Sequence, residues 1–315
     1  MASSRQFPSI GSLILGVAAC AVAACAREAS RPAQAFTDDW GRALALDSTP
    51  RRIVSLSPAS TEIVFALGLG ERLVGRTTWC DYPAAARAVP DVGNGIGPNV
   101  EVVVATHPDL VLLYASEANR QALARFEELR IPVAVLHLDR VLDVRRAAQA
   151  IATLAGRPSA GHSLVAAFDS TLAAVRQAVA LAERRPPRVY VDVEATPPIT
   201  VGSGSYLTEI LAEAGARNVF MDITGPSGTV SLETIVQRHP DVVLVLSSDT
   251  TRAPDLASRP GWSAVRAVRE GRVIVVDGSL YGRPSPRMPL AVRDLAQRLA
   301  RVAPPPRAAG REDGP

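Results

Sequence analysis

Short apolar runs alternate with longer amphipathic stretches along most of the chain. Six runs rich in branched residues are typical of buried parallel strands: 52–56, 110–113, 133–137, 188–193, 242–246 and 273–276. Helical stretches such as 118–129 and 207–214 lie between them, with glycine near several of their ends. Strands that alternate with helices predict an α/β fold built from doubly wound sheets.

The segment 158–185 breaks this alternation. It is rich in alanine and leucine and has no proline or glycine after Gly161. A helix of that length spans roughly 35 to 40 Å at 1.5 Å per residue. We therefore expect one long rigid helix that joins an N-terminal α/β lobe, 36–157, to a C-terminal α/β lobe, 186–302.

The two halves of the chain carry matching motifs in the same order. "EVVVATHPDLVLL" at 101–113 matches "ETIVQRHPDVVLV" at 233–245, with Glu, His, Pro and Asp at the same spacing. Upstream, "TEIVFALG" at 61–68 matches "TEILAEAG" at 208–215. The common order predicts a duplicated lobe, independently of any family likeness.

Residues 1–25 are typical of an export signal. Arg5 precedes an uncharged stretch that is apolar from Leu13 onward and too short for a lasting membrane span. Two "VAAC" sequences, ending at Cys20 and Cys25, resemble a lipoprotein cleavage site. We choose Cys25, because cleavage there leaves the longer apolar core behind; ordinary signal cleavage with incidental cysteines is the alternative. A diacylated Cys25 would hold the protein in the periplasm or at the outer face of the cell membrane.

The two ends of the mature chain have little pattern. Residues 26–35 are small and polar and predict a flexible tether. Residues 303–315 include three consecutive prolines and predict a disordered tail.

Composition argues against several functional classes. All 34 basic residues are arginine, and they are scattered among 31 acidic residues without forming a basic patch, so we expect no nucleic-acid partner. The four histidines are dispersed, which argues against a metal site. A dinucleotide fingerprint, a P-loop and a serine-hydrolase elbow are all missing, so we expect no catalytic residue, no cofactor and no enzymatic activity. Cys80 has no partner for a structural disulfide once the signal is removed.

Several motifs occur in order across about 36–300: "SLSPASTE", "TTWCDYP", "GNGIGPNVEVVVATHPDLVL", "ITVGSGSYLTEILAEAGARNVF", "VSLETIVQRHPDVVLV" and "YGRPSPR". As an ordered set they resemble the substrate-binding proteins of ABC importers, in the Fe/B12 periplasmic-binding family, whose lobes are joined by one long helix. The resemblance implies a protein that captures a small molecule and delivers it to membrane permease subunits driven by a cytoplasmic ATPase. Nothing in the sequence suggests more than a monomer. The resemblance also implies cobalamin or another corrinoid as the ligand. A ferric siderophore and haem stay open, because arginines and tyrosines suited to them are present: Arg76, Tyr82, Tyr281, Arg283 and Arg287.

The same resemblance implies a ligand cleft between the lobes. Ligands of open α/β sheets bind outside the carboxyl ends of the strands, so the loops there should face each other. They supply the expected ligand-binding residues: Ser57, Pro58, Trp79, Cys80, Tyr82, Gly95, Ile96, Ser203, Tyr206, Tyr281 and Arg283. Their aromatic rings suit a flat, partly apolar ligand. For Cys80 we expect a small residue in the loop, with approach of its thiolate to a ligand metal as the alternative.

Glu101 and Glu233 are equivalent in the repeat. By itself, each carboxylate would stabilise the first turn of a helix. The resemblance implies that both also contact arginines of the permease.

Overall fold

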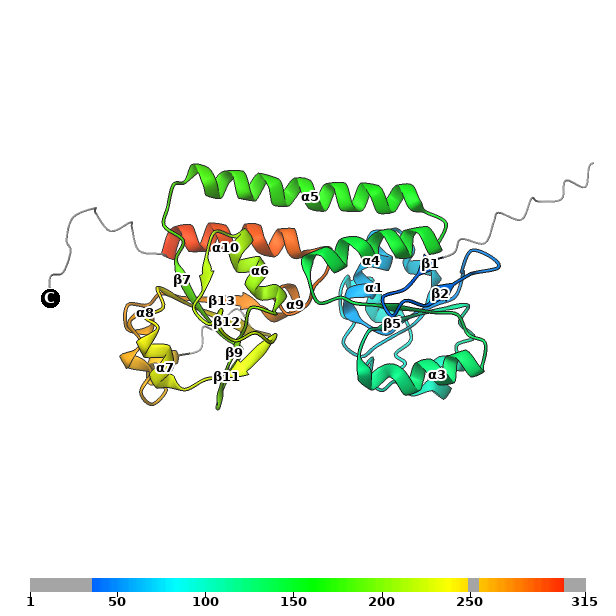
Figure 1. The fold of residues 1–315 in the computed structure, drawn as a ribbon, viewed down its shortest axis with the longest axis horizontal. Coiled ribbons are helices and arrows are strands. Elements are labelled where there is room, and N and C mark those ends of the chain that lie inside the picture. Colours follow the sequence, from blue (N-terminus) through cyan, green and yellow to red (C-terminus); the bar gives the residue numbers. More distant parts are fainter. Residues whose placement is uncertain (1–35, 249–254, 303–315) are drawn as a thin grey trace, which may run out of the picture.

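The computed structural model describes residues 36–248 and 255–302. Two lobes lie next to each other beneath one long helix (Figure 1). The expected signal at 1–25, the tether at 26–35 and the tail at 303–315 lie outside the described residues.

The N-terminal lobe contains a parallel four-stranded sheet in the order β4-β3-β5-β6. Its strands are β3 (Ile53–Ser55), β4 (Leu73–Arg76), β5 (Leu110–Tyr114) and β6 (Val133–Leu136). Its α-helices are α1 (Pro58–Ala66), α2 (Val100–Val104), α3 (Arg120–Glu128) and α4 (Val141–Leu154). A hairpin of β1 (Phe36–Thr37) and β2 (Ala43–Leu44) precedes the sheet, and short 3-10 turns are η1 (Gly70–Arg72), η2 (Ala84–Ala88) and η3 (Glu117–Asn119).

Both faces of this sheet are buried, which explains the uninterrupted apolar runs of its strands. Successive side chains alternate between the faces, so Ile53 packs with α1 and α4 whereas Val54 packs with α2 and α3.

The C-terminal lobe repeats this topology with the sheet order β10-β7-β12-β13, again parallel. Its strands are β7 (Arg188–Asp192), β10 (Arg217–Asn218), β12 (Val242–Ser247) and β13 (Val273–Asp277). Its α-helices are α6 (Tyr206–Glu213), α7 (Leu232–Gln237), α8 (Arg266–Arg269), α9 (Gly278–Tyr281) and α10 (Met288–Val302). A small antiparallel sheet consists of β8 (Glu194–Ala195), β9 (Pro198–Val201) and β11 (Ser227–Thr229), and the 3-10 turns are η4 (Leu256–Ser258) and η5 (Trp262–Ala264).

The duplicated lobe predicted from the motifs is confirmed, and the repeated His-Pro-Asp sequence is a structural turn. His107 and His239 both adopt left-handed backbone conformations, with φ of 50° and 46°. The aspartate of each turn then accepts main-chain N–H groups at the start of the lobe's first sheet strand: Asp109 from Arg52 at 2.8 Å, and Asp241 from Arg188 at 2.9 Å.

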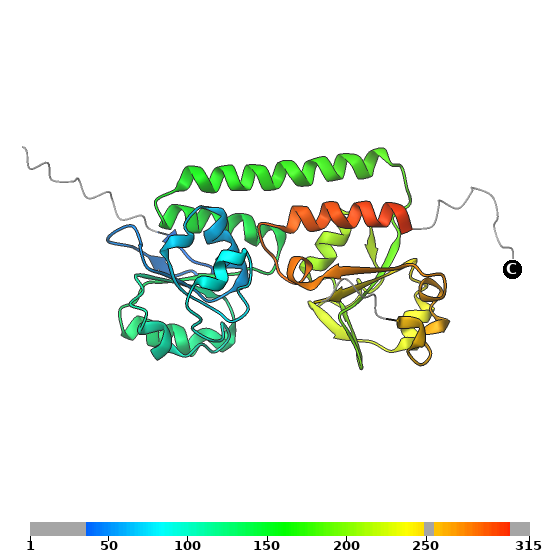
Figure 2. The same ribbon diagram turned by 180° about the vertical axis from the view of Figure 1, so that it is seen from behind.

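The expected connecting helix is α5 (Pro158–Leu181), which has 24 residues and so a length of about 36 Å. Its length and apolar composition would also suit a membrane span. Here, however, Leu164 and Val165 pack on the core of the N-terminal lobe, and Phe168 and Leu172 belong to the core of the C-terminal lobe. Figure 2 shows α5 spanning both lobes from behind. Because α5 packs on both cores, it is a rigid connection.

Candidate functional site

A cavity of about 690 Å³ opens between the lobes, within the size range of small-molecule sites. The N-terminal lobe lines it with residues that follow β3, β4 and β6 and with Tyr114, the last residue of β5. The C-terminal lobe lines it with residues that follow β9, β10 and α9. This is the edge at which open α/β sheets bind ligands. Of the expected ligand-binding residues, those that line the cavity are Ser57, Pro58, Trp79, Gly95, Ile96, Tyr206 and Arg283.

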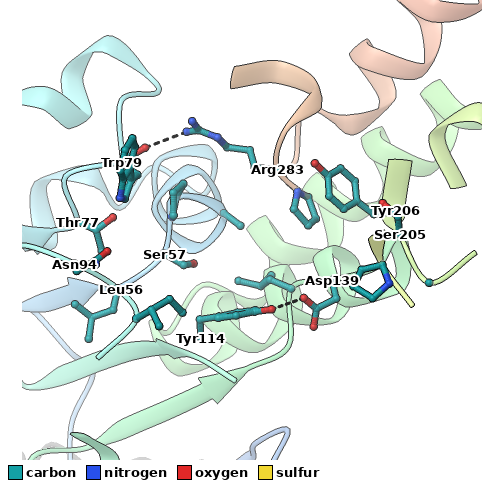
Figure 3. A pocket seen from close by; sticks show the side chains of 18 residues that line it. Leu56, Ser57, Thr77, Trp79, Asn94, Tyr114, Asp139, Ser205, Tyr206 and Arg283 are labelled. Atoms are coloured by element: carbon teal, nitrogen blue, oxygen red, sulfur yellow. Dashed lines mark hydrogen bonds between the residues drawn. The ribbon is translucent and has the colours of Figure 1, made fainter. Parts of the chain in front are cut away.

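Aromatic rings form much of the cleft surface (Figure 3). The Trp79 indole is 67% exposed, and Tyr114 lies on the same lobe, while Tyr206 is on the opposite lobe. Ile96, which is 46% exposed, adds to the apolar surface. Such a surface can hold a flat ligand by ring contacts.

Tyr114 and Asp139 were not predicted as site residues. The Tyr114 hydroxyl donates to Asp139 Oδ1 at 2.5 Å, and Nδ1 of His137 lies 3.2 Å from Asp139 Oδ2. Burial, and then the hydrogen bond to Asp139, hold the pKa of Tyr114 far above its ordinary value, so the phenol stays protonated. Tyr114 is the last residue of β5, and Asp139 follows β6. The rule that ligands bind outside the carboxyl ends of the strands, here called the carboxyl-end rule, would have found both if it had been applied to each strand.

Asn119 holds the glycine-rich loop against the floor of the cleft. It is fully buried, and its Nδ2 donates to the carbonyls of Gly95 at 3.1 Å and Tyr114 at 2.9 Å. Its Oδ1 accepts from the N–H of Gly97 at 2.9 Å. Glycine is required at position 95, because a Cβ there would lie 2.2 Å from the Leu56 carbonyl oxygen. The loop is therefore held close to the strand ends.

The structure corrects the expectation for Cys80 and Tyr281. Cys80 is fully buried beneath its loop, where Thr61 Oγ1 donates to its Sγ at 3.1 Å and Thr77 Oγ1 lies at the same distance. The Tyr281 hydroxyl donates to Asp294 at 2.8 Å inside the C-terminal lobe. Neither side chain lines the cavity, so in this structure the Cys80 thiol and the Tyr281 phenol are not placed to contact a ligand there.

Ser203 and Tyr82 also lie outside the cavity lining. Ser203 Oγ donates to the carbonyl of Ile223 at 3.0 Å, and its neighbours Gly204 and Ser205 line the cleft in its place. The Tyr82 ring packs under the guanidinium of Arg287, 3.8 Å from the ring centroid.

The arginines considered for an anionic ligand are engaged within the protein. Arg76 donates to the Thr77 carbonyl at 2.9 Å, and Arg287 is paired with Glu62 at 2.6 Å. Arg283 does line the cleft, but its Nη1 lies 2.7 Å from Asp81 Oδ1.

Glu101 and Glu233 occupy the first turns of α2 and α7, as the repeat predicts. Both are exposed, so both are accessible to a partner. Their contact with a permease stays a prediction.

Comparison with known proteins agrees with this geometry. A family model described as periplasmic binding protein matches residues 53–280. The chain is 32% identical over 255 residues to an uncharacterized ABC transporter substrate-binding lipoprotein, YvrC, of Bacillus subtilis, covering 79% of this chain and 80% of that one. It is 30% identical to a vitamin B12-binding protein of Yersinia pestis, covering 81% and 88% of the two chains.

A solved structure of the periplasmic heme-binding protein BhuT in complex with two hemes has a similar fold. Its TM-score is 0.73 at 30% sequence identity, over 80% of this chain and 98% of that one. Together with the parallel sheets, the connecting helix and the cleft, these matches show that the chain belongs to the periplasmic binding protein family and is a substrate-binding protein of an ABC transporter, similar to B12-binding and haem-binding members.

Proposed function

We propose that this protein captures cobalamin or a related corrinoid in the cleft between its lobes and delivers it to the permease of an ABC importer. The observation that carries the proposal is an aromatic, largely apolar cleft whose charged side chains already have partners. Vitamin B12-binding relatives such as that of Yersinia pestis support the same ligand class.

The charges of the cleft disfavour an anionic ligand. Among the described residues that line it, Arg283 and Asp139 carry charge, and each is bonded to another protein group. A ferric siderophore or a haem propionate would compete with Asp81 for Arg283. The amide rim of a corrinoid is uncharged and needs only hydrogen-bond partners, which Ser57, Asn94 and nearby main-chain groups can provide.

Haem is the second candidate, favoured by the likeness to BhuT. An axial tyrosine would bind ferric iron as a phenolate. The phenols of Tyr114 and Tyr206 both donate to protein acceptors, to Asp139 and to the Tyr281 carbonyl. Burial raises the pKa of each phenol far above its ordinary value, so deprotonation to bind iron is unfavourable.

The remaining parts of the proposal concern the oligomeric state, the chemistry and the cellular location. We expect a monomer without a cofactor or enzymatic activity, exported and held at the membrane through a lipid on Cys25 or Cys20. The YvrC relative is named a lipoprotein, which supports this anchor.

Titration of the purified protein with cyanocobalamin, haemin and a ferric siderophore tests the proposal. We expect micromolar or tighter binding of cyanocobalamin by calorimetry. Tyr114→Phe removes a hydroxyl and keeps the ring, so it should leave corrinoid affinity within about threefold. If haem is the ligand, this variant or its Tyr206→Phe counterpart should alter the Soret absorption. Failure to bind any corrinoid would overturn the proposal.

A further inference from the structure

Two hydrogen-bonded arginine–glutamate pairs join the lobes to each other. Arg283 lies farther from Glu62, at 3.9 Å. In the first, Glu62 of α1 accepts two hydrogen bonds from Arg287 of the C-terminal lobe, at 2.7 and 2.6 Å. In the second, Glu209 of α6 accepts from the Arg140 side chain and, at 2.8 Å, from the main-chain N–H of Val141, both in the N-terminal lobe.

The two pairs are equivalent in the repeat. Glu62 and Glu209 are the glutamates of the matching "TEI" motifs. Arg140 directly precedes α4, the last helix of the N-terminal sheet unit, and Arg287 directly precedes α10, the last helix of the C-terminal lobe. Each lobe therefore offers a glutamate to the arginine at the start of the other lobe's last helix.

The arrangement of the helices explains why these residues meet. Helices α4 and α10 lie end to end beneath α5, with their N-terminal ends toward each other (Figures 1 and 2). Helix N-termini carry partial positive charge, so two that face each other favour nearby carboxylates. Glu62 and Glu209 supply those carboxylates, and Val144 of α4 extends the contact by packing in the core of the C-terminal lobe.

The pairs differ in burial. The side chains of Glu62 and Arg287 are 2% and 12% exposed, whereas those of Glu209 and Arg140 are 23% and 48% exposed. Removal of one partner from a buried bidentate pair leaves an uncompensated charge, while an exposed pair contributes little. Next to the buried pair, Arg283 links to Asp81 at 2.7 Å and adds a further contact between the lobes.

We propose that Glu62, Arg287, Glu209 and Arg140 are positioning residues that fix the separation of the lobes, and thereby the width of the cleft, with the buried Glu62–Arg287 pair dominant. The effect on ligand capture rests on the function proposed above. The effect on lobe separation does not, so it is measured on the ligand-free protein.

Hydrogen–deuterium exchange of the ligand-free full chain tests the proposal. Glu62→Gln should speed exchange of the Val141 amide at least threefold, even though that amide is bonded to Glu209 of the other pair. The control is Asp222→Asn, which weakens a more exposed bidentate pair with Arg238 inside the C-terminal lobe, at 2.6 Å for both bonds. This control should leave the Val141 amide unchanged. Faster exchange confined to the surroundings of residues 62 and 287 would overturn the proposal.

A second variant, Arg140→Gln, tests the proposal in case Glu62→Gln does not fold. Arg140→Gln alters the exposed pair and keeps the hydrogen bond from the Val141 amide to Glu209. It should speed amide exchange in the loop 283–287, by a smaller factor than Glu62→Gln speeds exchange at Val141. Small-angle scattering should show a larger radius of gyration for Glu62→Gln combined with Arg140→Gln than for the natural sequence. An unchanged radius in a folded double variant, with unchanged exchange at 283–287 in Arg140→Gln, would reject the positioning role.

Discussion

The guanidinium of Arg283 in the C-terminal lobe donates to the main-chain carbonyl of Trp79 in the N-terminal lobe at 3.2 Å (Figure 3). The same guanidinium is paired with Asp81, so it holds the loop that carries Trp79 at two residues. Its indole nevertheless remains 67% exposed over the cleft. An aromatic ring on a fixed main chain loses little freedom when a ligand binds, which favours affinity.

Replacement of Trp79 should therefore weaken corrinoid binding strongly. We expect Trp79→Ala to lower the affinity for cyanocobalamin at least tenfold, about 1.4 kcal/mol, measured by calorimetry. Trp79→Phe should lose less, because an aromatic face remains. Leu181→Ala, at an exposed position of α5, serves as the control and should bind like the natural protein. Equal affinities for all three variants would exclude a ligand contact by Trp79.

Asn119 should be important for stability although no ligand contact is expected of it. Asn119→Ala leaves the carbonyls of Gly95 and Tyr114 and the N–H of Gly97 without this partner. We expect the free energy of unfolding to fall by about 1 to 3 kcal/mol in urea titrations. Asn94→Ala, at an exposed position of the same loop, should change it by less than about 0.5 kcal/mol. A similar loss of unfolding free energy in both variants would contradict the stabilising role of the Asn119 hydrogen bonds.

Cys80→Ser should leave ligand binding unchanged, because the thiol is enclosed between Thr61 and Thr77 away from the cavity. Calorimetry and the absorption spectrum of bound cyanocobalamin are the measurements. A shift of the corrinoid bands in the serine variant would instead restore a contact between sulfur and ligand.

Charge reversal at the repeated glutamates should separate transport from binding. Glu101→Arg with Glu233→Arg should abolish uptake in cells while the purified protein keeps its affinity for cyanocobalamin. Glu71→Arg is the control. It reverses the charge of an exposed glutamate in the first turn of the 3-10 helix η1, and cells that carry it should retain uptake. Loss of affinity in the double variant would place Glu101 and Glu233 in the ligand-binding site instead of on the surface that contacts the permease.

Stability should fall at alkaline pH. Burial, together with the neighbouring Asp192 and Asp294, holds the pKa values of Tyr190 and Tyr281 far above the ordinary value. Below pH about 10 both the folded and the unfolded chain keep these protons, so the contribution to stability is fully present. Above it only the unfolded chain releases them, and the free energy of unfolding falls by up to about 1.4 kcal/mol per pH unit for each phenol.

Urea unfolding between about pH 9 and pH 11 measures this slope. Tyr281→Phe removes one titrating group, so its slope should be shallower than that of the natural protein. A stability that stays constant over this range would show that the buried phenols do not keep their protons.

Much of the fold was predictable because its signals are local. The apolar runs that predicted strands lie within a few residues of β3, β5, β6, β7, β12 and β13, and the long helix ends at Leu181, close to the predicted end at 185. Helices α4 and α10 were not identified. Strand β4 was also missed, because it has four residues with a glycine among them, too short a pattern to stand out.

The site was predictable only in part. The carboxyl-end rule found the loops, but it does not say which side chain of a loop faces the cavity. Trp79 faces the cavity, whereas Cys80 is enclosed by Thr61 and Thr77 from the neighbouring helix and strand end.

The sequence by itself determined the duplicated lobes, the connecting helix and the family, since these depend on periodicity and on motifs that occur twice. Only the tertiary structure decided how the lobes are joined. Glu62 and Arg287 are 225 residues apart in the chain, and their pairing depends on the packing of α4, α5 and α10, which brings two helix N-termini together. No local sequence pattern predicts that arrangement, because Glu62 and Arg287 each belong to a motif whose sequence does not depend on contact between the lobes.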